Sequence, residues 1–443
     1  MMYKNRVPVA IAALLALSAC GIIKGGHKKT PTLGDRVPIL MSESEVTADR
    51  ALADVQVLLP PATANDSWAQ PGGSAAKSMG QLALGGTLSR AWSAQIDGGS
   101  NRQRLGAAPV IADGKLFAMD VDATVHAFGA ANGNKLWSTT IAKTDKKTRG
   151  ARFGGGVSYD DGKVYATDGI GDVVALNAAN GAELWRAKPG GPLRGAPSIS
   201  DGNLYVLSQD NQLFALSEAD GTTVWTQAGS IESQGVFGVA APAASQGTVV
   251  AGFSSGELNA YRVENGRAIW GDALSRTSIS TSVSSLADID ADPVIDDTNV
   301  YALGQGGRLI AANLATGQRL WEQNFAGIST PWLAGEWLFV VTDESKLYCL
   351  QRSTGKIRWI SQLRAFQVEK KKKKKNPLTW YGPVLAGNRL VLVNSLGDMV
   401  FASPSDGAIG QTIPGKDGFS LGPVVANNTL YVLDGRGRIS AYR

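Results

Sequence analysis

The sequence predicts an all-β fold, an eight-bladed β-propeller in which each blade is a four-stranded sheet. Three observations support this prediction. Glycine is abundant, with 53 among 443 residues, as a chain with many tight turns requires. Short apolar runs alternate with turn pairs such as Asp113-Gly114 and Asp201-Gly202, which favour two-residue hairpins. An eleven-residue phrase also recurs at intervals of 38 to 51 residues, and repeats of this length made of four short strands are typical of propellers.

The recurring phrase places a small residue and then a glycine at fixed distances before a tryptophan. Its six copies are "AFGAANGNKLW" (127–137), "ALNAANGAELW" (175–185), "ALSEADGTTVW" (215–225), "AYRVENGRAIW" (260–270), "AANLATGQRLW" (311–321) and "CLQRSTGKIRW" (349–359). The glycine stands where a hairpin needs a positive φ, and the tryptophan can dock on the neighbouring blade and bury roughly 150–250 Å². We therefore predict structural, blade-docking roles for Trp92, Trp137, Trp185, Trp225, Trp270, Trp321 and Trp359.

Two further repeats depart from the phrase. The seventh keeps Gly407 but has Gln411 in place of the tryptophan, and the eighth reaches the C-terminus before a fourth strand. The segment 88–95, which contains Trp92, precedes the first full copy. We predict that this N-terminal strand completes the C-terminal blade, because closing the ring removes exposed strand edges.

The N-terminal residues lie outside the predicted propeller. A short apolar run after Lys4 and Arg6 ends in "LSAC" at Cys20, and it is shorter than the ~20 residues that a membrane-spanning helix needs. This pattern predicts a lipoprotein signal peptide over residues 1–19 and a lipid, including palmitate, on Cys20; an ordinary secretory signal is the alternative. Residues 20–80 have the Pro, Ser, Ala and Gly content of a mostly flexible tether, and residues 81–443 form the predicted propeller.

The positive charge of the chain comes from one local feature. The formal net charge is +5, and Lys370 to Lys375 form a run of six lysines. Aromatic residues are not interleaved with this run, as a single-strand binder would require, so nucleic acid is excluded as a partner. We expect a solvated loop here, with contact to anionic lipid headgroups or to an acidic partner as the alternatives.

The sequence offers no constellation for catalysis or metal binding. Its two histidines are His27 and His126, and Cys349 stands where the other copies of the phrase have alanine, as a small buried residue would. The acidic stretch "LADIDADPVIDD" (286–297) lacks the Gly and Glu positions of a calcium-binding EF-hand. We therefore expect no enzyme activity, no metal and no cofactor.

The phrase at this period resembles the pyrroloquinoline-quinone-type propeller repeat over residues 85–443. The resemblance implies the fold and leaves the function open, because quinone-dependent dehydrogenases and the BamB lipoproteins of the outer-membrane β-barrel assembly machinery (the BAM complex) share it. The dehydrogenases hold their quinone with Ca²⁺, a catalytic Asp and a disulfide between adjacent cysteines, and this chain has no adjacent cysteines. The segment Leu17 to Cys20 matches the lipobox, the sequence that directs lipid attachment to a bacterial lipoprotein. This lipobox, the tether and the eight blades match the BamB family instead.

The resemblance to the BamB family implies a non-enzymatic scaffold. Such a protein is lipid-anchored in the outer membrane and faces the periplasm. It binds the periplasmic domains of BamA, the central barrel protein, and assists the assembly and insertion of outer-membrane proteins, with nascent outer-membrane proteins as further partners. The alternatives are a periplasmic lipoprotein that binds sugar or cell wall and, less favoured, a quinone-dependent dehydrogenase.

The resemblance also implies an acidic partner-binding segment. The family has a Leu-x-Asp-x-Asp segment before the first strand of one repeat, and Leu286 to Asp290 match this pattern. We expect Asp288 and Asp290 to be exposed carboxylates that pair with a basic patch on the partner. A solvated turn is the alternative.

A second family segment, Leu-Arg-Gly, matches this chain imperfectly. Leu193 and Arg194 fit it, but they stand two repeats before the acidic segment rather than one, and the expected repeat has Val236 and Phe237 instead. Either the Arg contact has moved by one blade, or an apolar contact from Phe237 replaces it. We include Leu193, Arg194, Val236 and Phe237 among the candidate partner-binding residues.

Overall fold

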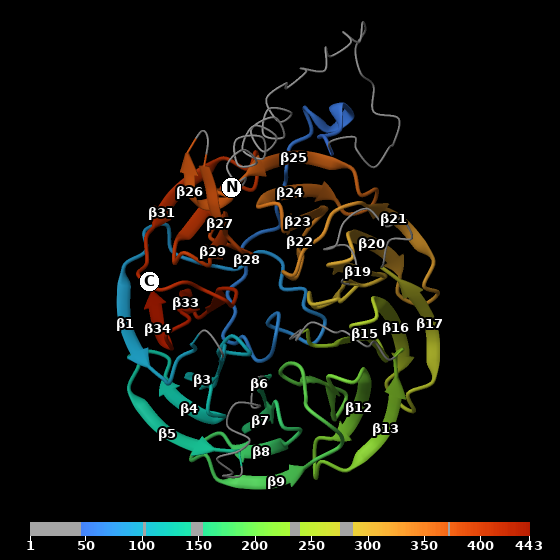
Figure 1. The fold of residues 1–443 in the computed structure, drawn as a ribbon, viewed down its shortest axis with the longest axis vertical. Coiled ribbons are helices and arrows are strands. Elements are labelled where there is room, and N and C mark those ends of the chain that lie inside the picture. Colours follow the sequence, from blue (N-terminus) through green and yellow to red (C-terminus); the bar gives the residue numbers. More distant parts are fainter. Residues whose placement is uncertain (1–45, 101–102, 143–153, 231–239, 275–286, 371–372) are drawn as a thin grey trace, which may run out of the picture. The chain divides into compact units, whose positions relative to one another are not determined.

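Eight four-stranded antiparallel sheets surround a central axis (Figure 1). The computed structural model describes residues 46–443 except 101–102, 143–153, 231–239, 275–286 and 371–372. In each blade the strands follow the chain from the axis outward, apart from the last blade. The predicted eight-bladed β-propeller of four-stranded blades is confirmed.

Blades 1 to 4 occupy the first half of the propeller. Blade 1 consists of β2 (Val110–Ala112), β3 (Lys115–Met119), β4 (Thr124–Gly129) and β5 (Lys135–Thr140), and blade 2 of β6 (Gly155–Asp160), β7 (Lys163–Asp168), β8 (Val173–Asn177) and β9 (Glu183–Ala187). Blade 3 consists of β10 (Ser198–Ser200), β11 (Asn203–Leu207), β12 (Gln212–Ser217) and β13 (Thr223–Ala228), and blade 4 of β14 (Ala243–Ser245), β15 (Thr248–Gly252), β16 (Glu257–Arg262) and β17 (Ala268–Ala273).

Blades 5 to 8 complete the ring. Blade 5 consists of β18 (Val294–Ile295), β19 (Asn299–Gly304), β20 (Arg308–Asn313) and β21 (Arg319–Gln323), and blade 6 of β22 (Trp332–Ala334), β23 (Trp337–Val341), β24 (Lys346–Gln351) and β25 (Ile357–Gln362). Blade 7 consists of β28 (Trp380–Ala386), β29 (Arg389–Asn394), β30 (Met399–Ala402) and β31 (Ile409–Ile413), and blade 8 of β32 (Val424–Ala426), β33 (Thr429–Leu433), β34 (Arg438–Tyr442) and β1 (Arg90–Gln95).

Blade 8 joins the two ends of the propeller. Strand β1 pairs antiparallel with β34, with Ser93 opposite Ser440, and forms the outermost strand of the sheet. The predicted closure by the segment around Trp92 is therefore confirmed.

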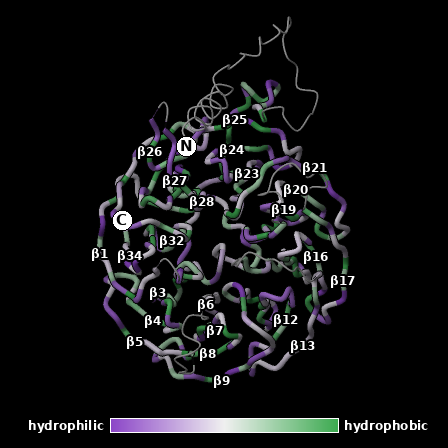
Figure 2. Tube along the Cα trace, in the orientation of Figure 1, coloured by the Kyte–Doolittle hydropathy of each residue, from purple (hydrophilic) through white to green (hydrophobic). Residues whose placement is uncertain are grey.

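The burial of each strand follows its distance from the axis. Inner and middle strands such as β7 and β20 are buried on both faces, because neighbouring blades cover them from both sides. Outer strands such as β1 and β5 alternate between exposed and half-buried residues. Figure 2 accordingly shows hydrophilic residues recurring along the outer ring of strands and hydrophobic residues gathered within it.

The tryptophans of the outer strands dock on the next blade. The indole Nε1 of Trp225 donates to the carbonyl oxygen of Val263 at 2.8 Å, and its ring covers Gly266, where an added Cβ would lie 2.6 Å from the ring. Gly266 has a φ of 69°, so this position favours glycine for both space and conformation. The same indole-to-carbonyl bond, 2.7–3.2 Å long, recurs at Trp92, Trp137, Trp185, Trp270, Trp321 and Trp359.

Residues 60–86, which we call the floor segment, contact every blade near the axis. Its hydrogen bonds join Asn65 to Val425 in blade 8, Trp68 to Ile111 in blade 1, Ala69 to Tyr159 in blade 2, Gln70 to Ile199 in blade 3, Ala75 to Ala244 in blade 4, Ala76 to Ile295 in blade 5, Gly80 to Trp332 in blade 6 and Leu82 to Leu385 in blade 7. The segment runs once around the axis and forms the floor of the central channel.

The structure corrects the tether prediction for residues 46–80. Residues 47–443 form one compact unit, and the chain before the floor segment is fixed to blade 6, where the Asp49 amide donates to the Ile357 carbonyl at 2.8 Å. The small residues that suggested flexibility let the backbone approach the inner strands closely, and buried Trp68 and Leu82 anchor it. Cys20 and the predicted signal peptide lie outside the described residues.

The lysine run also differs from the prediction. Its described lysines, Lys370 and Lys373 to Lys375, lie in a two-stranded hairpin of β26 (Phe366–Lys370) and β27 (Lys373–Pro377) inserted between blades 6 and 7, whereas a loop was expected. Lys371 and Lys372 lie outside the described residues. The alternating half-buried Phe366 and Val368 on β26 give this hairpin one apolar face at its base. In the described part of the chain the single helical element is the 3-10 turn η3 (Arg50–Leu52), and no helix there could span a membrane.

Candidate functional site

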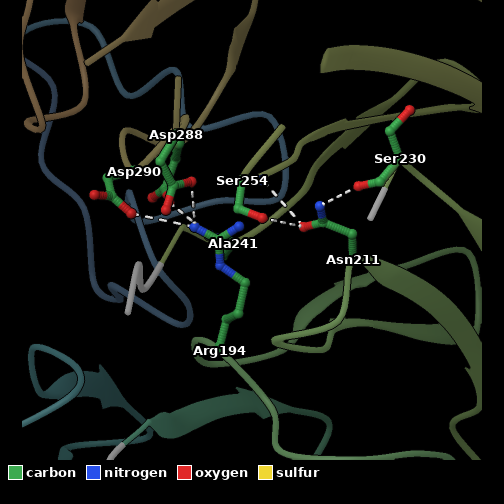
Figure 3. Close-up of polar contacts among 8 residues, drawn as sticks. Arg194, Asn211, Ser230, Ala241, Ser254, Asp288 and Asp290 are labelled. Carbon is green, nitrogen blue, oxygen red and sulfur yellow. Dashed lines mark hydrogen bonds and ion pairs between the residues drawn. The ribbon is translucent and has the colours of Figure 1, made fainter. Parts of the chain in front are cut away.

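Arg194 and the acidic segment meet at the axis of the propeller. Arg194 Nη2 donates to Asp288 Oδ1 at 2.7 Å and to Asp290 Oδ1 at 3.2 Å, and Figure 3 shows the guanidinium pointing at both carboxylates. We call these three residues the axial triad. They come from the loops that enter blade 3 and blade 5, so the loop into blade 4 lies between them in the chain.

Two loops place the axial triad. Leu193 is fully buried, and the amide of Arg194 donates to the carbonyl of Leu207 at 2.8 Å, so β11 fixes the arginine side. On the acidic side, the Asp288 carbonyl accepts from the Gln305 amide at 2.9 Å, and Ile289 between the two carboxylates is fully buried. Loops that lead from an outer strand back to the next inner strand all end near the axis, which is why non-adjacent blades meet here.

The expectation of exposed carboxylates is wrong. Only 1% of Asp288 and 1% of Arg194 are accessible, and 10% of the Asp290 side chain is. A buried carboxylate requires a paired cation, and Arg194 supplies it. Within the chain, Arg194 contacts the acidic segment from two blades away, and its part in a partner contact stays a prediction. Val236 and Phe237 lie outside the described residues.

Burial shifts the protonation of the acidic side chains. It raises the pKa of Asp290 to about 6, with the nearby charge of Asp288 adding to the rise and Arg194 opposing it. Burial likewise raises the pKa of Asp288, again against the effect of Arg194. At neutral pH Asp290 is therefore mostly ionised and paired with Arg194, while mild acid protonates it.

A second polar network, centred on Asn211, joins blade 3 to blade 4. Asn211 Nδ2 donates to the Ser230 carbonyl at 2.7 Å, and Asn211 Oδ1 accepts from the Ser254 hydroxyl at 2.8 Å and the Ser254 amide at 3.0 Å (Figure 3). Asn211 is almost fully buried. The network ties turns of blades 3 and 4 together at the same end of the channel as the axial triad.

A second buried cation, Lys77, comes from the floor segment. Its Nζ donates to Ser198 Oγ at 2.9 Å, and burial lowers its pKa to about 8 although the charge of Asp292 opposes this shift. Asp292 accepts from the Ala241 amide at 2.7 Å, and burial raises its pKa. Sequence reasoning missed Lys77; the one available signal was a lone lysine among small residues in "SAAKSMG".

The two ionic groups border a cavity of about 370 Å³ in the channel. Trp68, Gln70 and Lys77 of the floor segment line it, as do Asp290 and Asp292 of the acidic segment. Trp68 stacks on Trp332 of blade 6 with ring centroids 6.0 Å apart. The cavity is thus floored by the N-terminal segment and walled by the inner ends of the blades.

The remaining chemical groups brace the fold. His126 Nε2 and Asp120 Oδ2 lie 2.7 Å apart in a turn of blade 1, where Asp120 also accepts two backbone amides. Cys349 is fully buried, and burial raises the pKa of its thiol. Among the described residues no group of three or more His, Cys, Asp or Glu side chains is arranged to hold a metal ion.

The fold and this site define a propeller of pyrroloquinoline-quinone-type repeats whose axis holds paired ionic groups above a floor made by its own N-terminal segment. The family described as "Outer membrane protein assembly factor BamB" matches residues 121–361. The BamB of Escherichia coli (strain K12) is 30% identical over 349 residues, which cover 78% of this chain and 86% of that protein. The chain therefore belongs to the BamB family of outer-membrane protein assembly factors.

Other relatives and solved structures are similar over different shares of their length. The BamB of Yersinia pestis is 28% identical over 206 residues, and the match spans 46% of this chain and 50% of that protein. Among solved structures, BamB from Moraxella catarrhalis is similar with a TM-score of 0.68 at 20% identity, covering 81% of this chain and all of that one. The quinohemoprotein alcohol dehydrogenase of Comamonas testosteroni gives a TM-score of 0.67 at 13% identity, covering 86% of this chain and 81% of that one. At these identities both structures show the fold alone.

Proposed function

We propose that this chain is a non-catalytic scaffold of the outer-membrane β-barrel assembly machinery that binds the periplasmic domains of BamA. It acts on the periplasmic side of the outer membrane, attached by a lipid on Cys20, and assists the assembly of outer-membrane proteins. Membership of the BamB family supports this proposal, as does the lipobox ending at Cys20.

The axial triad is the observation that carries the proposal. Arg194 joins the loop into blade 3 to the loop into blade 5 through two ion pairs. Because Arg194 and Asp288 are buried, their role is to position these loops, and the partner contacts the exposed residues that the loops carry. Lys188 and Pro192, and Asp210 in the adjoining turn, are exposed at this end of the channel, which we call the channel mouth.

The pairing of the axial ionic groups supports a non-catalytic role. A general acid or base needs a group that can exchange a proton with a substrate. Here Asp288 and Asp290 are engaged by Arg194, and Lys77 bonds Ser198 beside the charge of Asp292. Charges that neutralise one another hold the loops and the floor segment in place.

Binding of the soluble chain (residues 21–443) to the periplasmic domains of BamA tests the proposal. Calorimetry compares the unmodified chain with an Asp288→Ala/Asp290→Ala variant. The matched control is Asp272→Ala/Glu322→Ala, which removes the two carboxylates that pair with Arg319 on the outer strands. We expect the axial variant to bind at least tenfold more weakly, about 1.4 kcal/mol, and the control to bind normally.

The outcomes test the proposed partner and the proposed role of the axial triad separately. Equal loss in both variants, or no loss in either, would reject the axial triad as the organiser of the interface while keeping BamA as the partner. Failure of the unmodified chain to bind would reject the proposed partner. Thermal melts of all three proteins check that weakened binding does not reflect unfolding.

A further inference from the structure

The hairpin β26–β27 displays the most concentrated positive charge among the described residues. Lys370, Lys373, Lys374 and Lys375 are all exposed. Lys370 faces Lys373 and Lys375 faces Val368 across the two strands, and the one acidic residue of the hairpin is Glu369, opposite Lys374. The hairpin is a two-stranded sheet of its own, separate from the blade sheets, and the ammonium groups of these lysines are open to solvent.

The base of this hairpin is held firmly. The Leu378 amide donates to the Ala365 carbonyl at 2.9 Å, and Trp380 Nε1 donates to the Arg364 carbonyl at 2.9 Å. Within the hairpin, Lys374 Nζ lies 5.5 Å from the centre of the Phe366 ring. The Trp380 bond ties the base of the hairpin to β28 of blade 7, and the other two contacts hold the hairpin together.

The chemistry of the hairpin favours a charged surface over a folded protein as its target. Lysine is a strongly hydrated point charge, whereas arginine makes shaped, bidentate contacts. Protein–protein interfaces are accordingly depleted in lysine and enriched in arginine and aromatic residues. Clusters of four to eight basic residues are instead typical of segments that bind anionic lipid headgroups.

We propose that the β26–β27 hairpin binds an anionic lipid surface. The contact is electrostatic, through the headgroup phosphates, and it needs no insertion of apolar side chains. It adds to any covalent anchor: the first described residues are fixed to Ile357 at the start of β25, and the hairpin follows the end of the same strand. A chain already confined to a membrane meets that surface at high effective concentration, so weak contacts suffice.

Vesicle binding of the chain made from Gly21 to Arg443, without Cys20 and hence without lipid, tests this inference. The probes are vesicles with about 30% phosphatidylglycerol in phosphatidylcholine, and vesicles of phosphatidylcholine alone. The hairpin variant is Lys373→Glu/Lys374→Glu/Lys375→Glu. The matched control reverses three exposed basic residues elsewhere, Lys135→Glu/Arg267→Glu/Lys416→Glu, and so has the same net charge.

We expect sedimentation with the anionic vesicles only, and a decrease as salt rises from about 0.1 M to about 0.5 M, because screening weakens exposed charges. The hairpin variant should bind at least tenfold more weakly, and the control within about threefold of the unmodified chain. Equal losses in the two variants would show that net charge alone acts and would overturn the inference. So would absence of binding to anionic vesicles, or loss of BamA binding by the hairpin variant with vesicle binding intact. Since vesicles contain no protein, the result is independent of the proposed partner.

Discussion

Two clusters of one arginine and two carboxylates lie at opposite ends of the blade radius. In the axial triad, Arg194 pairs with Asp288 and Asp290 in almost complete burial. On the outer strands of blades 4 and 5, Arg319 contacts Asp272 at 2.6 Å and also contacts Glu322. There, 28% of the arginine, 21% of Asp272 and 41% of Glu322 are accessible. We call this second cluster the rim triad.

The rim triad is partly exposed and the axial triad is buried, and this difference indicates what the outer strands and the axis each contribute to the propeller. The rim triad joins adjacent blades in water, where ion pairs contribute little, and Trp270 beside it provides the stronger link. The axial triad joins blades 3 and 5 in almost complete burial, so each charge depends on its partner. The outer strands therefore repeat one contact around the ring, the docking of a tryptophan on the next blade. The axis instead holds ionic contacts that occur once, and these make one end of the channel different from the rest of the surface.

Removing the floor segment should have the largest effect. A chain that begins at Thr87 loses the hydrogen bonds to all eight blades and the burial of Trp68, Leu82 and Leu84. Each such side chain contributes a few kcal/mol, so we expect a stability loss of more than about 5 kcal/mol, seen in thermal melting by circular dichroism. A chain that begins at Thr47 is the control and should melt like the mature protein. Equal melting of the two would show that the segment is dispensable.

Substitution of a rim tryptophan should cost somewhat less. Trp225→Ala removes an indole-to-carbonyl bond and the cover over Gly266, and we expect a loss of about 3–5 kcal/mol in denaturant titrations. Because the device is repeated, Trp321→Ala should cost the same within about 1 kcal/mol. A large difference between the two positions would contradict the equivalence of the blades.

Substitution of the two arginines should cause clearly different losses of stability. Arg194→Ala leaves two buried carboxylates without their cation, which typically costs about 3–5 kcal/mol. Arg319→Ala leaves carboxylates that water can reach, and we expect a loss below about 1 kcal/mol. Denaturant titrations of both variants make the comparison, and similar losses would mean that burial does not distinguish the triads.

The pH dependence of the axial triad should be smaller than the loss of stability on Arg194→Ala. The pKa of Asp290 is about 6 in the folded state and its unfolded value is near 4. Its proton-linked stability is therefore fully present below about pH 4 and is lost as the pH rises through 6. Relative to Asp290→Asn, which does not titrate, the unmodified chain should gain about 1–2 kcal/mol when the pH falls from about 7.5 to 4.5. A constant difference between the two proteins across this range would contradict the pKa shift.

The docking contacts of the outer strands could be predicted from the sequence, whereas the contacts of the axial triad could not. The glycines and tryptophans of the phrase obey a local rule, a turn followed by a docking site, and the rule repeats often enough to be recognised. The closing strand at Trp92 followed from counting strands. In contrast, Arg194 and Asp290 are 96 residues apart, and their meeting depends on how eight loops converge.

Composition misled the reading of the floor segment and of the acidic segment. Glycine, proline and serine suggested a tether, but the same small residues permit close backbone contact with the inner strands once the ring exists. Likewise, two aspartates beside a loop suggested exposure, whereas the loop leads into the channel. The lone lysine in the floor segment gave only a weak signal, because its partner Ser198 lies 121 residues further along the chain, in blade 3.

Site-specific photocrosslinking of the full-length chain in cells tests the central claim most directly: the channel mouth, organised by the axial triad, is the face that meets BamA. Crosslinking residues replace Lys188 and Asp210, which are exposed at the mouth, or Asn180 and Glu264, which are exposed in turns at the other ends of their blades. We predict adducts with BamA from positions 188 and 210 and none from 180 and 264. Adducts from 180 and 264 alone would contradict the account and place the partner on the opposite face.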